Sequence, residues 1–138
     1  MTIRVFTDGA ARGNPGKAGI GIVIKDENGS VLAEVKKYIG TSTNNNAEYT
    51  ALLHALEFIL GSETLRCSAV VVHTDSELMA RQILGEYKVK EPGLKLMHQK
   101  VILLLKSAPF SFTIRHIPRS QNAEADALAN EAIDSQTL

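Results

Sequence analysis

The sequence contains no tryptophan and a single cysteine, Cys67. One cysteine excludes an internal disulfide and suits a reducing compartment. Long hydrophobic runs are also missing, because the longest apolar block covers only residues 101–105. No stretch therefore approaches the length of a membrane span, and the first residues lack the apolar core of a signal peptide. These absences predict a cytoplasmic protein without a membrane anchor.

An excess of charge is absent as well, because fifteen Lys and Arg residues balance fifteen Asp and Glu residues. Net charge therefore does not indicate a nucleic-acid partner, and any basic surface has to be local. Hydrophobic residues make up 44% of the chain, which is typical of a globular domain. We find no repeat, low-complexity tract or linker that would divide the sequence. We expect one domain over residues 1–138, with no obligate protein partner evident.

The first strand is expected at residues 3–8, where Ile3, Val5 and Thr7 alternate with the residues between them. Asp8 ends this strand, and the following residues 9–16 are rich in glycine and contain a proline, which should break regular structure. A carboxylate between a strand and a glycine-rich loop can hold a metal ion or a charged substrate. The alternative is a simple turn, because Asp-Gly is a common hairpin pair.

The remaining patterns predict four further strands and four helices. The strands are expected at residues 19–24, 31–39, 69–74 and 110–117, and the helices at about 45–60, 77–84, 94–107 and 123–134. The first three strands should form an antiparallel meander, because Asn28-Gly29 is a strong hairpin signal. Strands one, four and five should be parallel, because helices separate them. The predicted fold class is α/β, a three-layer fold with a mixed five-stranded sheet.

Four acidic residues recur at equivalent places in this predicted fold. Asp8 and Asp75 follow neighbouring strands, while Glu48 and Asp126 lie in the first turns of two helices. Ligands of such sheets bind beyond the carboxyl ends of the parallel strands, and converging carboxylates repel unless a cation is bound. Oxygen ligands favour Mg²⁺ or Mn²⁺, and two such ions about 4 Å apart are suited to phosphodiester hydrolysis.

Taken singly, these acids have plainer explanations. Glu48 stands three residues after Asn45, as in a helix capping pair. Asp75 or Ser76 is suited to cap the helix that follows the fourth strand. Only the joint arrangement of the four acids favours a metal site.

The order of the motifs resembles the type 1 ribonuclease H family. The matching segments cover essentially the whole chain; they are Thr7-Asp8-Gly9 with Gly13-Asn14-Pro15-Gly16, Thr43-Asn44-Asn45 with Ala47-Glu48, Thr74-Asp75-Ser76, and residues 122–129. The resemblance implies an RNase H-like fold and an endonuclease that hydrolyses the RNA strand of RNA–DNA hybrids, leaving 5′-phosphate and 3′-hydroxyl ends. It also implies that two Mg²⁺ or Mn²⁺ ions are bound with the substrate by Asp8, Glu48, Asp75 and Asp126.

The same resemblance implies which residues contact the substrate: Gly9, Asn14, Thr43, Asn44, Asn45, Ser76 and Arg119. The asparagines and the Gly9 backbone would lie along the minor groove, where RNA displays its 2′-hydroxyls. Thr43 resembles a DNA-phosphate contact of the family. The alternative for each asparagine is a turn or cap residue.

Two features depart from many family members. The Trp-containing basic segment before the last strand is missing, and this region offers only Lys88, Lys90, Lys95 and Lys100. The chain looks more like a compact subgroup, for which duplex RNA is a further candidate substrate.

A non-catalytic hybrid- or RNA-binding domain is the first alternative function, disfavoured because all four acids are present. A DNA-directed nuclease of the same superfold is the second, disfavoured by the Asn44-Asn45 pair.

The second departure concerns His116, which stands ten residues before Asp126, near the spacing of a mobile-loop histidine of the family. The period-two pattern of Phe112 and Ile114 instead places His116 within the strand and toward the core. We therefore expect a structural role for His116. Arg119, just beyond the strand, is the better candidate to approach the metal site or a phosphate.

Overall fold

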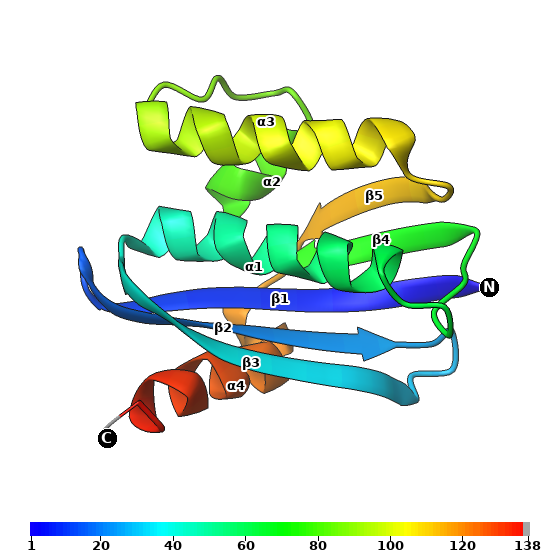
Figure 1. Cartoon of the computed structure of the whole chain (residues 1–138), viewed down its shortest axis with the longest axis horizontal. Coiled ribbons are helices and arrows are strands. Elements are labelled where there is room, and N and C mark those ends of the chain that lie inside the picture. The colour runs from blue at the N-terminus through cyan, green and yellow to red at the C-terminus, as the bar shows by residue number, and fades with distance from the viewer. Residues whose placement is uncertain (137–138) are drawn as a thin grey trace.

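A computed structural model describes residues 1–136 of the chain. The elements in chain order are β1 (Thr2–Gly13), β2 (Gly16–Lys25), β3 (Val31–Ser42), α1 (Asn44–Leu60), β4 (Ala69–Thr74), α2 (Glu77–Ile83), α3 (Pro92–Ser107), β5 (Ser111–His116), the short 3₁₀ helix η1 (Arg119–Gln121) and α4 (Ala123–Asp134) (Figure 1). The predicted order of strands and helices is confirmed. In this part of the chain no helix combines the length and the apolar character needed to cross a bilayer.

The five strands form one sheet in the order β3-β2-β1-β4-β5. β1 to β3 pair antiparallel, while β4 pairs parallel with both β1 and β5, as predicted. α1 packs on β1 and β2, α3 packs on α1, and α4 packs mainly on β2. Figure 1 shows α3 and α4 at opposite sides of the molecule, with the sheet and α1 between them. Residues 18–24 of β2 are all buried, because helices cover both faces of this strand.

The glycine-rich stretch after Asp8 is part of the sheet, which corrects the predicted loop. β1 continues to Gly13 and pairs with β2 along its whole length, down to Gly13 opposite Gly16. Asn14 and Pro15 form the turn, and the peptide bond between them is cis. Alanine, glycine and arginine have weak strand propensity, so the local sequence did not indicate this extension. Pairing with β2 decides it.

Helix α4 lies unusually close to β2. A Cβ at Gly21 would overlap the main-chain oxygen of Ala125, so only glycine allows this approach. The short distance brings the first turn of α4, which contains Asp126, next to the middle of the sheet.

Candidate active site

Three acidic side chains converge where β1 and β4 separate. Asp8, Glu48 and Asp75 each offer one carboxylate oxygen, and these oxygens all lie within 4.8 Å of one another. Asp8 and Glu48 are buried, with exposed fractions of 4% and 8%, and Asp75 is half-buried. We call these residues the three-acid cluster.

The strand register brings Asp8 to Asp75. Parallel pairing of β1 with β4 ends at Thr7 opposite Thr74, so the next residue of each strand is one of the two acids. β4 stops there, while β1 continues along β2. The buried side chain of Asn122 fastens the segment before α4 to this point, because its Nδ2 donates to the main-chain oxygen of Thr7 at 2.8 Å. The acids thus lie at the end of the parallel pairing and not at the end of β1.

Glu48 is held by β1 and not by its own helix. Its Oε1 accepts a hydrogen bond from the main-chain N–H of Gly9 at 2.6 Å. A Cβ at Gly9 would overlap the backbone of Ala47, so glycine is required for α1 to come this close. The cap of α1 is Thr43, which accepts from the N–H of Asn46 at 3.2 Å. The capping interpretation of Glu48 with Asn45 is therefore wrong, and Glu48 lies just beyond the first turn.

Asp126 borders the cluster without belonging to it. It lies in the first turn of α4, as predicted, and its side chain is 29% exposed. Oδ1 of Asp126 lies 3.6 Å from Nη2 of Arg119 and accepts from Nδ2 of Asn130 at 3.3 Å. The structure therefore brings together three of the predicted acids tightly and the fourth at their edge.

Burial and mutual repulsion raise the proton affinity of the cluster. Burial raises the pKa of Asp8 strongly, and the charges of Glu48 and Asp75 raise it further. Burial, followed by the charge of Asp75, raises the pKa of Glu48 to about 8, against the lowering effect of the Gly9 N–H. These carboxylates favour any ligand that supplies positive charge.

The residues present fit a hard divalent cation. The cluster consists of carboxylates alone, without His or Cys, and oxygen donors of this kind suit Mg²⁺ or Mn²⁺ better than zinc. A cation at Asp8, Glu48 and Asp75 would relieve the repulsion that raises the pKa values of Asp8 and Glu48.

The cluster opens into a polar cavity of about 530 Å³. Besides the four acids, the predicted site residues that line it are Gly9, Asn44, Asn45, Ser76 and Arg119. Asn14 and Thr43 do not line it. Asn14 accepts from the main-chain N–H of Asn44 at 3.1 Å, and Thr43 caps α1. Ser76 also caps α2 by accepting from the N–H of Met79.

His116 lies at the end of edge strand β5, and its predicted burial is wrong. It pairs with Thr74 within the sheet, as expected of a strand residue, yet it and Arg115 are both exposed. Alternation predicts which side of a strand a residue faces, but at the end of an edge strand solvent reaches both sides. His116 does not line the cavity, whereas Arg119 does.

Two polar side chains of the site were not predicted from the sequence. Arg12 and Asn130 both line the cavity, and Arg12 reaches Asn130 from the far end of β1. A signal for Asn130 was available, because it stands one helical turn after Asp126 and so faces the same side of α4. Nothing local indicated Arg12, because the sequence pattern predicted a loop at this position.

Comparison with known proteins identifies the family. The sequence model described as "Reverse transcriptase-like" matches residues 6–132. Ribonuclease H of Halorhodospira halophila is 31% identical over 96% of this chain and 93% of its own length. The chain belongs to the type 1 ribonuclease H family. Ribonuclease HI of Halobacterium salinarum is 38% identical over 96% of this chain, which spans 64% of that relative.

Solved structures of the ribonuclease H family agree with the fold. LC11-RNase H1 in complex with an RNA/DNA hybrid is 50% identical, with a TM-score of 0.91 over 96% of this chain and 97% of that chain. RNase H1 of H. salinarum superposes with a TM-score of 0.90 over 98% of this chain and 99% of that chain, at 38% identity. The predicted RNase H-like fold is confirmed.

Proposed function

We propose that this chain is a divalent-metal-dependent endonuclease that hydrolyses the RNA strand of RNA–DNA hybrids. The observation that carries the proposal is the convergence of Asp8, Glu48 and Asp75 within one polar cavity. The solved complex of LC11-RNase H1 with a hybrid supports the choice of substrate. Residues 1–138 would act as a single catalytic domain, and the cytoplasmic location expected from Cys67 stays a prediction.

In this proposal Asp8, Glu48, Asp75 and Asp126 hold two Mg²⁺ or Mn²⁺ ions together with the scissile phosphate. Bound ions would supply the Lewis-acid chemistry that activates water and stabilises the leaving oxygen. The protein contributes the fixed positions of the carboxylates, through the Gly9–Glu48 hydrogen bond and the β1–β4 register. The products would carry 5′-phosphate and 3′-hydroxyl ends.

The substrate would be recognised along the exposed rim of the cavity. Asn44 and Asn45 are exposed at the start of α1, where amide groups can read the 2′-hydroxyls of the RNA minor groove. The backbone at Gly9 and Ser76 would approach the same strand. Asn14 and Thr43 accept from backbone N–H groups at the start of α1 instead of lining the cavity, which favours a supporting role, with Thr43 also available to a DNA phosphate.

The deciding experiment incubates the purified protein with end-labelled RNA–DNA hybrid, duplex RNA and duplex DNA, each with Mg²⁺, Mn²⁺ or EDTA. We expect internal cleavage of RNA in the hybrid with either metal and none in EDTA. Cleavage of duplex RNA in addition would extend the substrate range to the further candidate. Binding of the hybrid without cleavage in any metal would favour a non-catalytic domain, and cleavage of duplex DNA would favour a DNA-directed nuclease.

Arg119 and His116 form a matched pair for a second test. Arg119 is 80% exposed and reaches Asp126, so Arg119→Ala should lower kcat on the hybrid about tenfold without a measurable change in Tm. His116→Ala, a change at another exposed residue outside the cavity, should leave both kcat and Tm close to wild type. Steady-state kinetics and thermal melting check this. A large kcat loss for His116→Ala alone would restore the histidine as the proton carrier.

A further inference from the structure

A path of hydrogen bonds leads from Arg12, near the end of β1, to the carboxylate of Asp126. Nη2 of Arg12 lies 3.3 Å from Oδ1 of Asn130 and 3.4 Å from its main-chain oxygen. Nδ2 of Asn130 lies 3.3 Å from Oδ1 of Asp126 and 3.0 Å from its main-chain oxygen. All three side chains line the same cavity, so the path ends at the proposed metal site.

The donors and acceptors on this path determine the orientation of the Asn130 amide. A guanidinium group only donates hydrogen bonds, so the amide oxygen has to face Arg12. The amide nitrogen then faces Asp126, whose carboxylate only accepts. If the amide were reversed, its oxygen would face the Asp126 carboxylate and its NH₂ group would face the Arg12 guanidinium, and neither pair could form a hydrogen bond. Arg12 and Asp126 thus favour the same orientation, in which Asn130 donates to Asp126.

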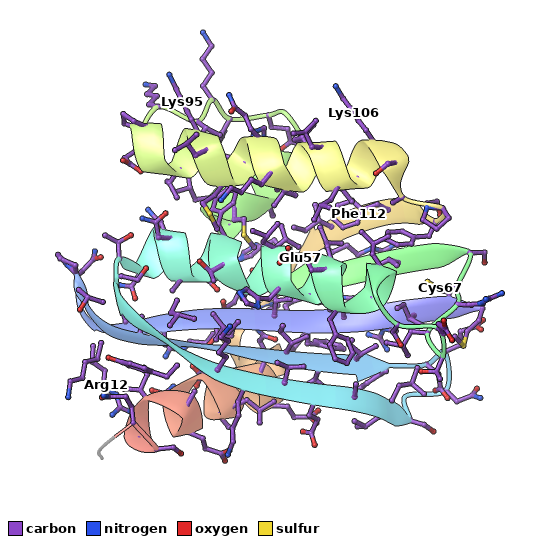
Figure 2. All side chains as sticks on the ribbon, viewed as in Figure 1. Arg12, Glu57, Cys67, Lys95, Lys106 and Phe112 are labelled. Carbon is purple, nitrogen blue, oxygen red and sulfur yellow. The ribbon has the colours of Figure 1, made fainter. Side chains whose placement is uncertain are left out.

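Arg12 is itself fixed at the C-terminal end of α4. Its Nη1 lies 2.6 Å from Oδ1 of Asp134, and Figure 2 shows Arg12 beside this helix. One guanidinium therefore joins β1 to α4 and reaches Asn130 at the same time. A predominantly exposed ion pair of this kind contributes little to stability. Its importance here is that it fixes the position of the Arg12 guanidinium.

Asp126 needs such a partner because it lies outside the three-acid cluster and has a competing contact. Arg119 approaches the same Oδ1 at 3.6 Å, but this guanidinium is 80% exposed and water screens its charge. The bond from Asn130 is shorter and comes from the same rigid helix. It can hold the carboxylate while Arg119 moves.

We infer that Asn130 is a positioning residue that holds the Asp126 carboxylate toward the three-acid cluster, and that Arg12 orients Asn130 for this task. The consequence for turnover rests on the proposed function, while the placement of Asp126 is a property of the protein alone. Loss of a hydrogen-bond partner of a metal-binding side chain commonly reduces metal affinity or activity about 10–100-fold.

The test compares wild type, Asn130→Ala and Arg12→Ala by two independent readouts. The first is kcat and KM on the hybrid at saturating Mg²⁺. The second is the Mg²⁺ concentration at the midpoint of the metal-induced rise in Tm, measured without substrate. For Asn130→Ala we expect kcat about tenfold lower, KM within about twofold, and a midpoint about tenfold higher, with Tm in EDTA unchanged. Arg12→Ala should lower kcat and raise the Mg²⁺ midpoint by roughly threefold each.

A double-mutant cycle shows whether Asn130 acts through Asp126. On an Asp126→Ala background, Asn130→Ala should cause no further loss in kcat and no further rise in the Mg²⁺ midpoint, because the side-chain acceptor of Asn130 is gone. Glu131→Gln is the matched control, since Glu131 is the neighbour of Asn130 on α4 but is exposed and pairs with Lys36, and it should behave as wild type.

The inference is overturned if Asn130→Ala leaves kcat and the midpoint unchanged, or if its effect persists in full on the Asp126→Ala background. It is equally overturned if Asn130→Ala or Arg12→Ala raises KM with kcat unchanged, which would mean a substrate contact. If the wild-type protein does not cleave the hybrid, the proposed function fails, while the Mg²⁺ midpoint still decides the placement of Asp126.

Discussion

Asp8→Asn, Glu48→Gln and Asp75→Asn should each reduce kcat on an RNA–DNA hybrid by at least about 10³-fold in Mg²⁺, equivalent to roughly 4 kcal/mol of lost transition-state stabilisation. Each change removes one negative charge from the three-acid cluster and nearly preserves the shape of the side chain. Asp126→Asn should retain more activity, because Asp126 lies at the edge of the cluster. Single-turnover cleavage of a labelled hybrid measures the loss.

Glu124→Gln is the matched control for these variants. Glu124 lies in the same first turn of α4 as Asp126, but it pairs with Lys25 and is exposed. Its substitution should leave kcat within about twofold of wild type. Near-normal activity of any one cluster variant in Mg²⁺ would remove that residue from the proposed set of core ligands.

The Glu48→Gln variant should lose activity but gain stability in the absence of metal. Such a gain would show that the lost activity does not come from misfolding. The folded-state pKa of Glu48 is raised from 4.5 to about 8, so its stabilising contribution is complete below pH 4.5 and is lost as pH rises to 8. Gln does not titrate, so in EDTA the Tm of Glu48→Gln should increasingly exceed that of wild type across this window. The gain should be largest at pH 8 and amount to several degrees in Tm.

Saturating Mg²⁺ should reverse this order of stability, because the cation binds the wild-type cluster more tightly than the variant. Thermal melting from pH 4.5 to 8.5, with EDTA and with Mg²⁺, measures both effects. If Glu48→Gln melted below wild type in EDTA at pH 8, the ionised Glu48 side chain would not destabilise the folded protein, and the prediction would be wrong.

Gly9→Ala should destabilise the fold by about 3 kcal/mol or more and lower Tm by roughly 10 °C. The new methyl group would overlap the backbone of Ala47 and Glu48, and backbone atoms cannot move aside as a flexible side chain can. Helix α1 would have to shift away from β1, which would also displace the Glu48 carboxylate from the Gly9 N–H. A displacement of this kind should lower kcat by more than tenfold even below the melting temperature.

Gly61→Ala provides the comparison for Gly9→Ala. Gly61 ends the same helix with a φ of −86°, and its Cβ would meet the main-chain oxygens of Glu57 at 3.2 Å and of Phe58 at 4.0 Å. We expect a change within about 1 kcal/mol and normal turnover. If Gly9→Ala melted and cleaved like Gly61→Ala, the close approach of α1 to β1 would not be needed to place Glu48.

The secondary structure and the candidate acids were predictable because they depend on neighbours in the sequence. Alternation marked β1 at Ile3, Val5 and Thr7, and a β-branched run marked β4. The parallel arrangement of β1 and β4 followed from the helix between them. Since Asp8 and Asp75 are the first residues after the β1–β4 pairing, this topology alone brought them together.

The tertiary structure alone decided the contacts between elements. The extension of β1 to Gly13 depends on β2, and the partner of Glu48 is an N–H on another strand. The exposure of His116 depends on its place at the end of an edge strand. Such contacts depend on how closely two backbones pack, and residues far apart in sequence set that distance jointly. The local pattern around Arg12 therefore could not show that its guanidinium reaches Asn130, 118 residues along the chain.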